Sequence, residues 1–407
     1  MEASLAISAL GVEEARRKSQ LSVVGLFAGI GGIELGLSQA GHASVLLCEV
    51  DLHAKAVLEA RFADVPLVSD VRDIPSLPPA DVIAAGFPCQ DLSQAGRTAG
   101  IGGRQSGLVS QIFRLIEGAT RAPKWLVLEN VSFMLQLDRG HAMRFLTESL
   151  VELGFTWAYR VVDTRSFGLP QRRQRVILVA SRTDDPREVL FADDSGAPIE
   201  SSVDAAAFGF YWTEGTRGLG WAIEAVPTLK GGSTIGIPSP PAVWVAEAGF
   251  VGTPDIRDAE RLQGFPVDWT EHAAVGSRGA GARWKLVGNA VSVPVARWLG
   301  KRLADPGVIT AHEEPLPQSA RWPIAAYGDA DGVRRVDVSQ WPVRGDSPGL
   351  SSFLEYPLKP LSSRATAGFL KRAKASRLRF ADGFLEGVER HLIAVDSGVA
   401  VDRQSVI

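Results

Sequence analysis

The residue with the clearest chemical potential is Cys89, which follows an apolar run at residues 82–85 and a Gly-Phe-Pro corner. A loop rich in small and polar residues comes after it, so we expect the side chain at the end of a buried strand. Thiolates are strong nucleophiles whose reactivity depends on local charge and exposure. A lone cysteine is also often a small buried apolar residue, so Cys89 needs suitable neighbours before it indicates an active site.

Carboxylates follow three further predicted strands. Glu49 ends the second strand, Asp70 follows a short third strand, and Glu129 ends the fifth. Helical patterns alternate with these strands, which predicts a parallel, doubly wound α/β sheet. Ligands bind outside the carboxyl ends of the strands in such a sheet, so the three carboxylates and Cys89 are expected along one edge.

A glycine-rich turn precedes these acids. The first predicted strand, residues 21–27, runs into glycines at 29, 31 and 32 and then into a helical pattern at 33–40. Such a turn lets the backbone approach a ligand and points a helix N-terminus at it. The spacing differs from the Gly-x-Gly-x-x-Gly dinucleotide motif, and a glycine turn alone can be purely structural. Glu49 lies twenty positions after Gly29, where an acid commonly binds ribose, so the combination favours a cofactor site.

Arg173 and Arg175 precede another predicted strand, at residues 176–180. In an extended segment, residues two positions apart point to the same face, so these two side chains share a face. An arginine cluster can be a solvated surface, but these residues stand before a buried strand. They are therefore expected to face the acidic site.

The composition limits the class of protein. The net charge is −3, so a nucleic-acid partner would require a local basic surface. Two cysteines and six scattered histidines support neither a disulfide framework nor a zinc-type spacing, and no metal is expected. The N-terminus lacks the pattern of a signal peptide. The apolar runs fall short of the ~20 residues that span a bilayer, so a cytoplasmic location and no membrane partner are expected.

Six sequence blocks follow one another along the chain. They are Phe27-Ala-Gly-Ile-Gly-Gly32, Gly86-Phe-Pro-Cys-Gln90 with Ser93, Glu129-Asn-Val131, Gln171-Arg-Arg-Gln-Arg175, Arg261-Leu-Gln-Gly-Phe-Pro266 and Gly288-Asn-Ala-Val291. Their order resembles the DNA cytosine-5 methyltransferases of bacteria and phages, and the resemblance covers roughly residues 21–300. It implies the α/β fold of S-adenosylmethionine-dependent methyltransferases with a smaller target-recognition domain. Asp258 is a minor departure, because the family commonly has glutamate there.

The resemblance implies a mechanism for four residues. Cys89 attacks C6 of cytosine, and Glu129 protonates N3. Arg175 holds the base carbonyl, and Arg173 helps to position Cys89 and the base. The methyl group comes from S-adenosylmethionine, and loss of the C5 proton expels Cys89. The base must first leave the helix, because its reactive atoms are inaccessible within the stack.

The resemblance also implies binding residues. In the cofactor pocket, Phe27 stacks near the adenine, Glu49 takes the ribose hydroxyls and Asp70 the adenine amino group. Arg217 and Lys230 are candidates for DNA contacts, although both could equally be solvated. The full cofactor set is Phe27, Gly29, Ile30, Gly31, Glu49, Val50, Asp70, Val71, Pro88, Leu108, Asn289 and Ala290. The full DNA set is Gln90, Ser93, Arg97, Arg217, Thr228 and Lys230.

Three regions are expected. Residues 1–183, completed by 284–304, form the catalytic domain, and 184–283 form the target-recognition domain. Residues 305–407 form a C-terminal extension. Within the extension, 304–360 predicts an irregular connector, followed by a basic amphipathic helix at 363–378 and a second helix at 382–392. The helical pair either packs on the catalytic domain or contacts DNA phosphates.

Three rival functions fit less well. An amino-methyltransferase would have an Asp/Asn/Ser-Pro-Pro-aromatic block where this chain has Phe87-Pro88-Cys89. A transfer-RNA methyltransferase of the same family would need a third cysteine. A catalytically inactive DNA-binding protein would not need Cys89, Glu129 and both arginines. The sequence indicates a monomer acting on double-stranded DNA, and it leaves open the DNA site and whether a restriction endonuclease accompanies the protein.

Overall fold

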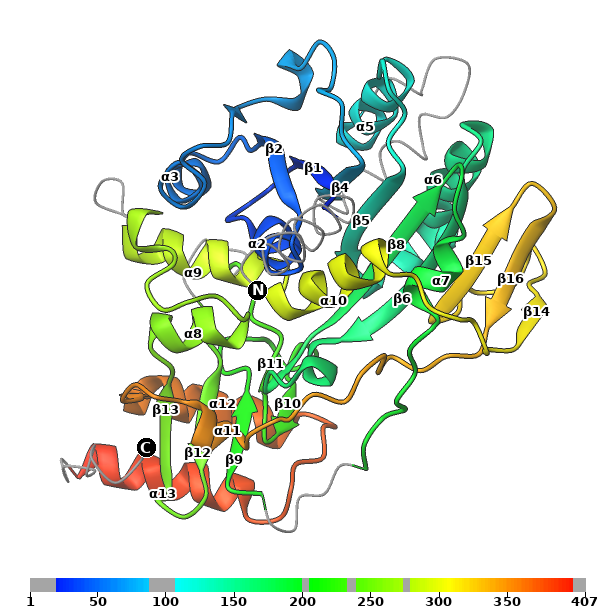
Figure 1. The fold of residues 1–407 in the computed structure, drawn as a ribbon. Helices are drawn as coiled ribbons and strands as arrows, with labels where there is room; N and C mark the ends of the chain where they lie inside the picture. Colours follow the sequence, from blue (N-terminus) through cyan, green and yellow to red (C-terminus); the bar gives the residue numbers. More distant parts are fainter. Residues whose placement is uncertain (1–19, 88–106, 200–204, 233–238, 274–278, 398–407) are drawn as a thin grey trace, which may run out of the picture.

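The centre of the molecule is a ten-stranded sheet. The computed structural model describes residues 20–87, 107–199, 205–232, 239–273 and 279–397. The strand order in the large sheet is β14-β16-β15-β6-β8-β5-β4-β1-β2-β3 (Figure 1). Its strands are β1 (Ser22–Leu26), β2 (Ala43–Cys48), β3 (Leu67–Val68), β4 (Val82–Gly86), β5 (Trp125–Val131), β6 (Thr156–Asp163), β8 (Gln174–Ser181), β14 (Glu313–Pro315), β15 (Ala325–Asp329) and β16 (Gly332–Val336).

The sheet is mixed, which corrects the expectation of a parallel sheet. Strands β3, β2, β1, β4 and β5 pair in parallel, but β8 is antiparallel to both β5 and β6. The reason is the short connection from β6 at Asp163 to β8 at Gln174. A parallel return needs a crossover of a dozen or more residues, usually with a helix, so the chain turns back antiparallel.

Alternating side chains give the large sheet two apolar faces. Val24 and Ile83 point to the face covered by α5 and α6, whereas Val23 and Val82 point to the face covered by α2, α7 and α10 (Figure 1). The close crossing of α2 and α10 requires small residues, because a Cβ at Gly36 would lie 2.5 Å from the Ala296 Cβ. The helices are α2 (Gly32–Gln39), α5 (Leu108–Glu117), α6 (His141–Glu152), α7 (Pro186–Leu190) and α10 (Val293–Ala304).

A second sheet lies below the first in Figure 1, with strand order β10-β9-β12-β13-β17. Helices α12 (Ser363–Ala375) and α13 (Phe384–Asp396) cover it. Aromatic residues from both layers, including Phe208, Trp244 and Phe384, form its core. The expected helical pair is present, but it packs on this small sheet rather than on the catalytic sheet. The strands are β9 (Ala207–Phe210), β10 (Trp221–Ile223), β12 (Ala242–Val245), β13 (Phe250–Thr253) and β17 (Lys359–Pro360).

The connector expected at residues 304–360 is only partly irregular, because it contains the strands β14, β15, β16 and β17 and a short helix at Leu350–Phe353. β15 pairs with β6 and β16 with β15, which extends the large sheet, and β17 pairs with β13 of the small sheet. An Asp-Gly pair at the β15–β16 turn, with Gly332 at φ 135°, is a hairpin signal that the overall Pro, Gly and Asp content obscured. The division into residues 1–183, 184–283 and 305–407 stays a prediction.

Residues 255–304 return from the small sheet to the side of the large sheet that carries the glycine turn at residues 29–32. Arg61 on α3 (Leu52–Arg61) donates to the carbonyls of Asp268 and Trp269, and the Trp269 indole donates to the Ile30 carbonyl at 2.8 Å. The other elements of the chain are η1 (Val71–Asp73), η3 (Ser132–Gly140), η4 (Thr164–Phe167), β7 (Gln171–Arg172), β11 (Val226–Pro227), α8 (Ile256–Leu262), η5 (Glu271–Ala273), α9 (Gly279–Asn289) and α11 (Leu350–Phe353). In the described ranges, no helix has the length and apolar character needed to cross a bilayer.

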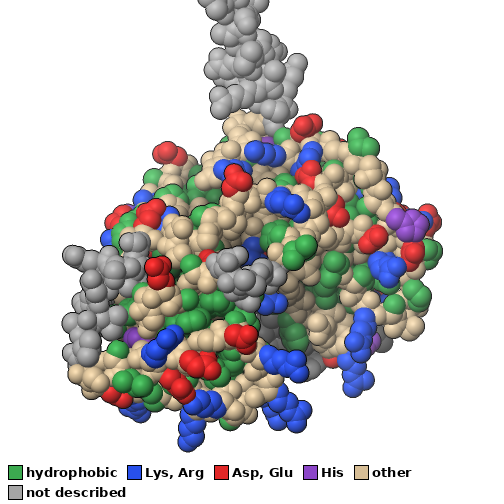
Figure 2. Space-filling view, turned by 90° about the horizontal axis from the view of Figure 1, so that it is seen from below, with side chains coloured by type: hydrophobic (Ala, Val, Ile, Leu, Met, Phe, Trp, Pro, Cys, Tyr) green, Lys and Arg blue, Asp and Glu red, His purple; other side chains and the backbone are tan. Residues whose placement is uncertain are grey.

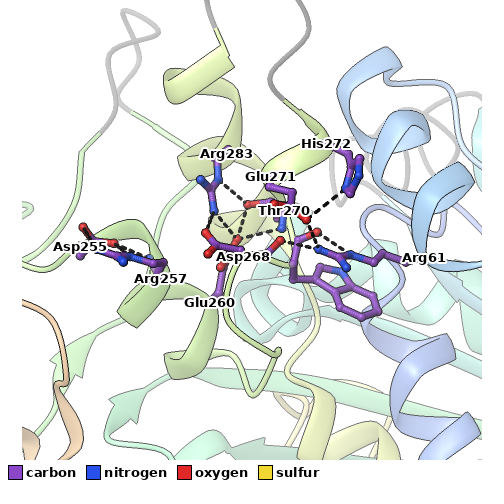
Figure 3. A network of polar contacts seen from close by, with 10 residues as sticks. Arg61, Asp255, Arg257, Glu260, Asp268, Thr270, Glu271, His272 and Arg283 are labelled. Atoms are coloured by element: carbon purple, nitrogen blue, oxygen red, sulfur yellow. Dashed lines mark hydrogen bonds and ion pairs between the residues drawn. The ribbon is translucent and has the colours of Figure 1, made fainter.

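A polar network fixes this return segment (Figure 3). The Glu260 carboxylate on α8 is fully buried, accepts a hydrogen bond from the Thr270 amide at 2.9 Å and pairs with Arg283 of α9 at 3.0 Å. Arg283 also pairs with Asp268 at 3.1 Å. The network therefore links α8, α9 and the loop that contacts α3.

We predict that Arg283→Ala destabilises the protein strongly. The substitution leaves the buried Glu260 carboxylate without its cation, which costs about 3 kcal/mol. Arg257→Ala is the matched control, because Arg257 pairs with Asp255 near the surface and its loss should cost far less. The free energy of unfolding is measured by denaturant titration. Equal losses for the two variants would contradict the importance of the buried pair.

Candidate active site

The ends of β4 and β5 bring Glu129 to the start of the Pro-Cys corner. Gly86 and Glu129 are register partners, and a Cβ at Gly86 would lie 3.6 Å from Glu129 Oε2. The Asn130 side chain donates to the Phe87 carbonyl at 2.9 Å, which anchors the last described residue before the corner. Cys89 is two residues further along the chain. Pro88, Cys89, Gln90, Ser93 and Arg97 all lie outside the described residues.

Glu129 forms an ion pair with Arg175, the residue that β8 places opposite the end of β5. Arg175 Nε lies 3.0 Å from Glu129 Oε1, and both side chains are largely buried. Burial raises the pKa of the Glu129 carboxyl, and the guanidinium groups of Arg175 and Arg173 offset part of this shift. A carboxyl with a raised pKa keeps its proton to higher pH, which suits a proton donor.

Arg173 is buried more deeply than Arg175, and its side chain contacts backbone carbonyls rather than the Glu129 carboxylate. Its guanidinium group donates to the carbonyls of Leu229 at 3.1 Å, Gly288 at 3.2 Å and Ala290 at 2.6 Å. Its side chain thus joins the β7–β8 segment to the residues just after β11 and to the end of α9. Arg173 and Arg175 belong to one motif, but the structure gives them different partners.

Two buried glutamines that the sequence analysis missed complete this junction. The Gln171 side chain accepts from the Leu229 amide at 3.0 Å and donates to the Leu262 carbonyl at 2.8 Å. The Gln263 side chain donates to the Val287 carbonyl at 2.9 Å and accepts from the Ser292 hydroxyl at 2.7 Å. For Gln263 the available signal was an uncharged polar residue between Leu262 and Gly264, whereas Gln171 lies between Pro170 and Arg172 and had no such signal.

The other cysteine, Cys48, is unsuited to nucleophilic attack. It ends β2 inside the core, with 2% of its surface exposed. Burial, followed by the charges of Glu49, Asp70 and Asp73, raises the pKa of its thiol to about 12. Because Cys48 stays protonated, Cys89 is the remaining thiol of the chain. Over the part of the chain that is described, no three His, Cys, Asp or Glu side chains gather as a metal site would require.

The glycine turn and Glu49 are directly connected. The Glu49 carboxylate accepts from the amides of Gly29 at 2.8 Å, Val50 at 2.9 Å and Asp51 at 2.8 Å. Gly29 has φ 57°, and a Cβ there would meet nothing within 4 Å, so the turn borders open space. Val50 is 68% exposed beside it, whereas Ile30 is buried. An apolar side chain exposed next to an open glycine turn suits contact with a planar ring.

The remaining cofactor candidates fall on both sides of this turn. Asp70 pairs with Arg72, whose hydrogen bonds lower the pKa of the Asp70 carboxyl to about 2, so it is an acceptor. Val71 is buried behind it. Phe27, with φ 56°, and Leu108, the first residue of α5, are half-buried against the core.

The end of α9 approaches the turn from the opposite side. A Cβ at Gly32 would lie 2.3 Å from the Val291 carbonyl oxygen, so the Gly-Asn-Ala-Val block touches the start of α2. Asn289 is exposed, and its side-chain oxygen would lie 2.3 Å from a Cβ at Gly231. Ala290 is buried through its contact with Arg173. Asn289 therefore stands at the edge of the site and Ala290 behind it.

A hollow of about 300 Å³ lies between Arg175 and the small sheet. Across from Arg175 it is lined by Tyr211, Trp221 and Thr228. Burial raises the pKa of Tyr211 to about 12, and its hydroxyl donates to the Thr228 carbonyl at 2.7 Å. The parallel pairing of β11 with β7 fixes this wall relative to the catalytic motif.

The candidate DNA-binding residues differ in whether their side chains already have partners in the fold. Thr228 lines the hollow, and its hydroxyl donates to the Arg172 carbonyl at 2.8 Å. Lys230 pairs with Glu214 at 3.0 Å and lies 4.0 Å from the centre of the Tyr211 ring. Arg217 is exposed. Thr228 and Lys230 thus lie at the hollow or beside its wall.

Comparison with known structures and family models agrees with this architecture. A model of the C-5 cytosine-specific DNA methylase family matches residues 21–206, which contain β1 to β8. The S. pombe Dnmt2 methyltransferase superposes with a TM-score of 0.50, covering 70% of this chain and 98% of that chain. The sequence identity is 14%, so this likeness concerns the fold alone.

Two bacterial proteins extend the match beyond residue 206. The Type II methyltransferase M2.BsuMI of Bacillus subtilis (strain 168) is 52% identical over 381 residues, covering 91% of this chain and 98% of that protein. The Type II methyltransferase M.NgoBI of Neisseria gonorrhoeae is 32% identical over 291 residues, covering 67% of this chain and 89% of that protein. Together with the catalytic sheet and its motifs, these matches show that the chain belongs to the C-5 cytosine-specific DNA methylase family, whose methyl donor is S-adenosylmethionine.

Proposed function

We propose that the chain is a DNA (cytosine-5-)-methyltransferase that modifies cytosine within one short site in duplex DNA. The observation that carries this proposal is the pair of Glu129 and Arg175, 3.0 Å apart, beside the strand end that leads into the Pro-Cys corner. A proton donor and a cation then lie at one edge of the sheet, beside the strand that leads toward the thiol. This set suits a heteroaromatic ring that is attacked at one atom and protonated at another.

Each catalytic residue has a defined role in this proposal. The Cys89 thiolate forms a bond to C6 of cytosine, which moves an electron pair of the ring toward N3. Glu129 gives its proton to N3 and so neutralises the negative charge on the ring. C5 then becomes a nucleophile. Arg175 donates to the base carbonyl and holds Glu129 in place. After C5 has gained the methyl group, loss of the C5 proton to water expels the Cys89 thiolate, and N3 returns its proton to the Glu129 carboxylate, which restores both the ring and the acid.

Arg173 is a positioning residue in this proposal. Its hydrogen bonds to Leu229, Gly288 and Ala290 leave the guanidinium group engaged with backbone. It therefore acts on the site by fixing the wall of the hollow and the end of α9. Its positive charge also offsets part of the rise in the pKa of Glu129.

The open glycine turn fits S-adenosylmethionine. The turn that Glu49 holds through the Gly29 amide and the exposed Val50 side chain border open space, where an adenosyl group would bind. Phe27, Asp70 and Leu108 would bind the purine side, and Asn289 would close the pocket. When bound there, S-adenosylmethionine supplies an electrophilic methyl group on its sulfonium sulfur.

The hollow beside Arg175 is the proposed place for the flipped base. Unstacking costs a few kcal/mol, which contacts in the pocket must offset. Tyr211, Trp221 and Thr228 provide aromatic and hydroxyl groups on its far wall. Gln90, Ser93 and Arg97 would contact DNA from the segment outside the described residues. Lys230 would have to exchange Glu214 for a phosphate, whereas Arg217 is already exposed.

The biological role follows from the relatives. M2.BsuMI and M.NgoBI carry Type II methyltransferase names, so we infer that this chain belongs to a restriction-modification system. Its partner would be a cognate endonuclease that cuts the same unmethylated site. The protein would act as a monomer in the cytoplasm of a bacterial or phage-infected cell, where its DNA substrate lies.

We predict that the purified protein methylates one short recurrent site in unmethylated duplex DNA of mixed sequence, given S-adenosylmethionine. Base-resolution mapping of 5-methylcytosine measures this, and Cys89→Ser should abolish it because the hydroxyl is a far weaker nucleophile. Intact cofactor binding in that variant is the control for folding. Wild-type levels of methylation in Cys89→Ser would refute the mechanism.

We predict that Glu129→Gln lowers kcat/KM for DNA by about 10²- to 10⁴-fold, because the general acid is lost. Burial raises the pKa of Glu129, so the wild-type acid is protonated below that pKa and is lost as the pH rises through it. The variant should therefore lack this alkaline fall. Glu148→Gln, on the exposed face of α6, is the matched control. An unchanged pH profile in Glu129→Gln would assign the proton transfer to another group.

We predict that Glu49→Gln weakens S-adenosylmethionine binding by about 2 kcal/mol, or roughly 30-fold, because an amide cannot replace a charged acceptor of three backbone N–H groups. Isothermal titration calorimetry measures the affinity. Glu59→Gln, on the exposed side of α3, controls for the change in charge. Equal affinities for both variants would place the cofactor elsewhere.

A further inference from the structure

The C-terminal part of the chain contains an uninterrupted basic stretch. Residues 361–380 include six Lys and Arg residues and no Asp or Glu, although the whole chain has a net charge of −3. A local excess of cations in an acidic protein needs a physical reason, because like charges close together repel. The six residues are Arg364, Lys371, Arg372, Lys374, Arg377 and Arg379.

Two of these cations have partners among the residues that the structure describes. The Arg372 guanidinium donates to the Trp212 carbonyl at 2.5 Å, and Lys374 pairs with Glu389 of α13. The other four are exposed, and no carboxylate pairs with them in the described ranges. Their charges are therefore available to an external anion.

The packing of α12 fixes the direction of this basic face. Phe369, Leu370 and Ala373 are buried against the small sheet. Arg364 and Lys371, seven residues apart, share the exposed side of the helix. Figure 2 is seen from below, the side on which Figure 1 places α12 and α13, and Lys and Arg side chains project along the lower rim of the face it shows.

The loop after α12, residues 376–381, reaches the wall of the proposed base pocket. The Trp221 indole donates to the Arg379 carbonyl at 3.0 Å, and the rings of Trp221 and Phe380 are 6.2 Å apart. Trp221 also lines the hollow that contains Arg175. Arg377 and Arg379 consequently project from a loop that is attached to the pocket wall.

We infer that this loop and the exposed side of α12 form a second DNA-binding surface, which holds the phosphates flanking the flipped cytosine. The inference rests on the proposed function. Duplex DNA carries a negative charge about every 1.7 Å along its axis, so a duplex that delivers a base to the hollow has phosphates near its rim. Guanidinium groups bind phosphate with two parallel hydrogen bonds. The C-terminal extension thereby supplies sequence-independent affinity, and the small sheet is left to read the bases.

The test is a variant that removes both loop cations, Arg377→Ala with Arg379→Ala. The contact to Trp221 uses the backbone carbonyl of residue 379, so the loop should keep its attachment. The matched control is Arg334→Ala with Arg335→Ala, which removes the same charge from β16, the strand next to the edge strand β14 of the large sheet. The conservative variant, Arg377→Lys with Arg379→Lys, keeps the charge.

The measurement is the dissociation constant for an unmethylated 30-base-pair DNA duplex of mixed sequence, over a range of salt concentrations. Two lost phosphate contacts should reduce the slope of log K against log salt by about 2. Affinity at low salt should fall about tenfold or more, and KM for DNA should rise with kcat nearly unchanged. The β16 control and the lysine variant should keep slopes close to that of the wild type. Binding of S-adenosylmethionine should be equal in all variants.

The failures of the two proposals are distinguishable. A wild-type protein that neither binds nor methylates the duplex would overturn the proposed function. Wild-type methylation together with an unchanged salt slope in the double alanine variant would overturn only the C-terminal surface. A slope reduced equally in the β16 control would show a general charge effect and would also overturn it. Tighter binding of an RNA duplex than of DNA would replace the proposed partner.

Discussion

The buried guanidinium group of Arg173 holds three backbone carbonyls, from Leu229, Gly288 and Ala290, at one junction. A buried charge is costly unless polar groups surround it, so this contact strongly constrains the segments that meet there. Gln171 and Gln263 add hydrogen bonds between the same segments. The position of the small sheet relative to the large one depends on this junction.

The active site depends on the same junction. Glu129 and Arg175 lie at the end of the large sheet, whereas Tyr211 and Trp221 belong to the small sheet, and the hollow exists only where the two meet. The return segment, fixed by Glu260 and Arg283, brings the end of α9 against the glycine turn. The Glu129 carboxyl, the hollow beside Arg175 and the contact between α9 and the glycine turn are thus parts of one packed unit.

Much of the fold could be predicted from local patterns. The apolar runs that become β1, β2, β4 and β5 and the glycine turn before α2 are continuous in the sequence, and each matched an element of the structure. The direction of β8 could not be read from its composition, because parallel and antiparallel strands use similar residues; only the length of the preceding connection decided it. Strands β15 and β17 pair with β6 and β13, which are far away in the sequence. The local hairpin of β15 and β16 was missed because the Pro, Gly and Asp content of the region obscured its signal.

The sequence by itself determined the chemistry, because reactive side chains in a fixed order, such as Cys89, Glu129 and Arg175, identify the reaction class without any coordinates. Only the tertiary structure decided how similar residues divide their roles. Burial makes the Cys48 thiol unreactive, and long-range hydrogen bonds set Arg173 apart from Arg175. Packing likewise placed the cations after α12 beside Trp221. Burial and contacts between distant segments arise only when the chain has folded, so no local pattern encodes them.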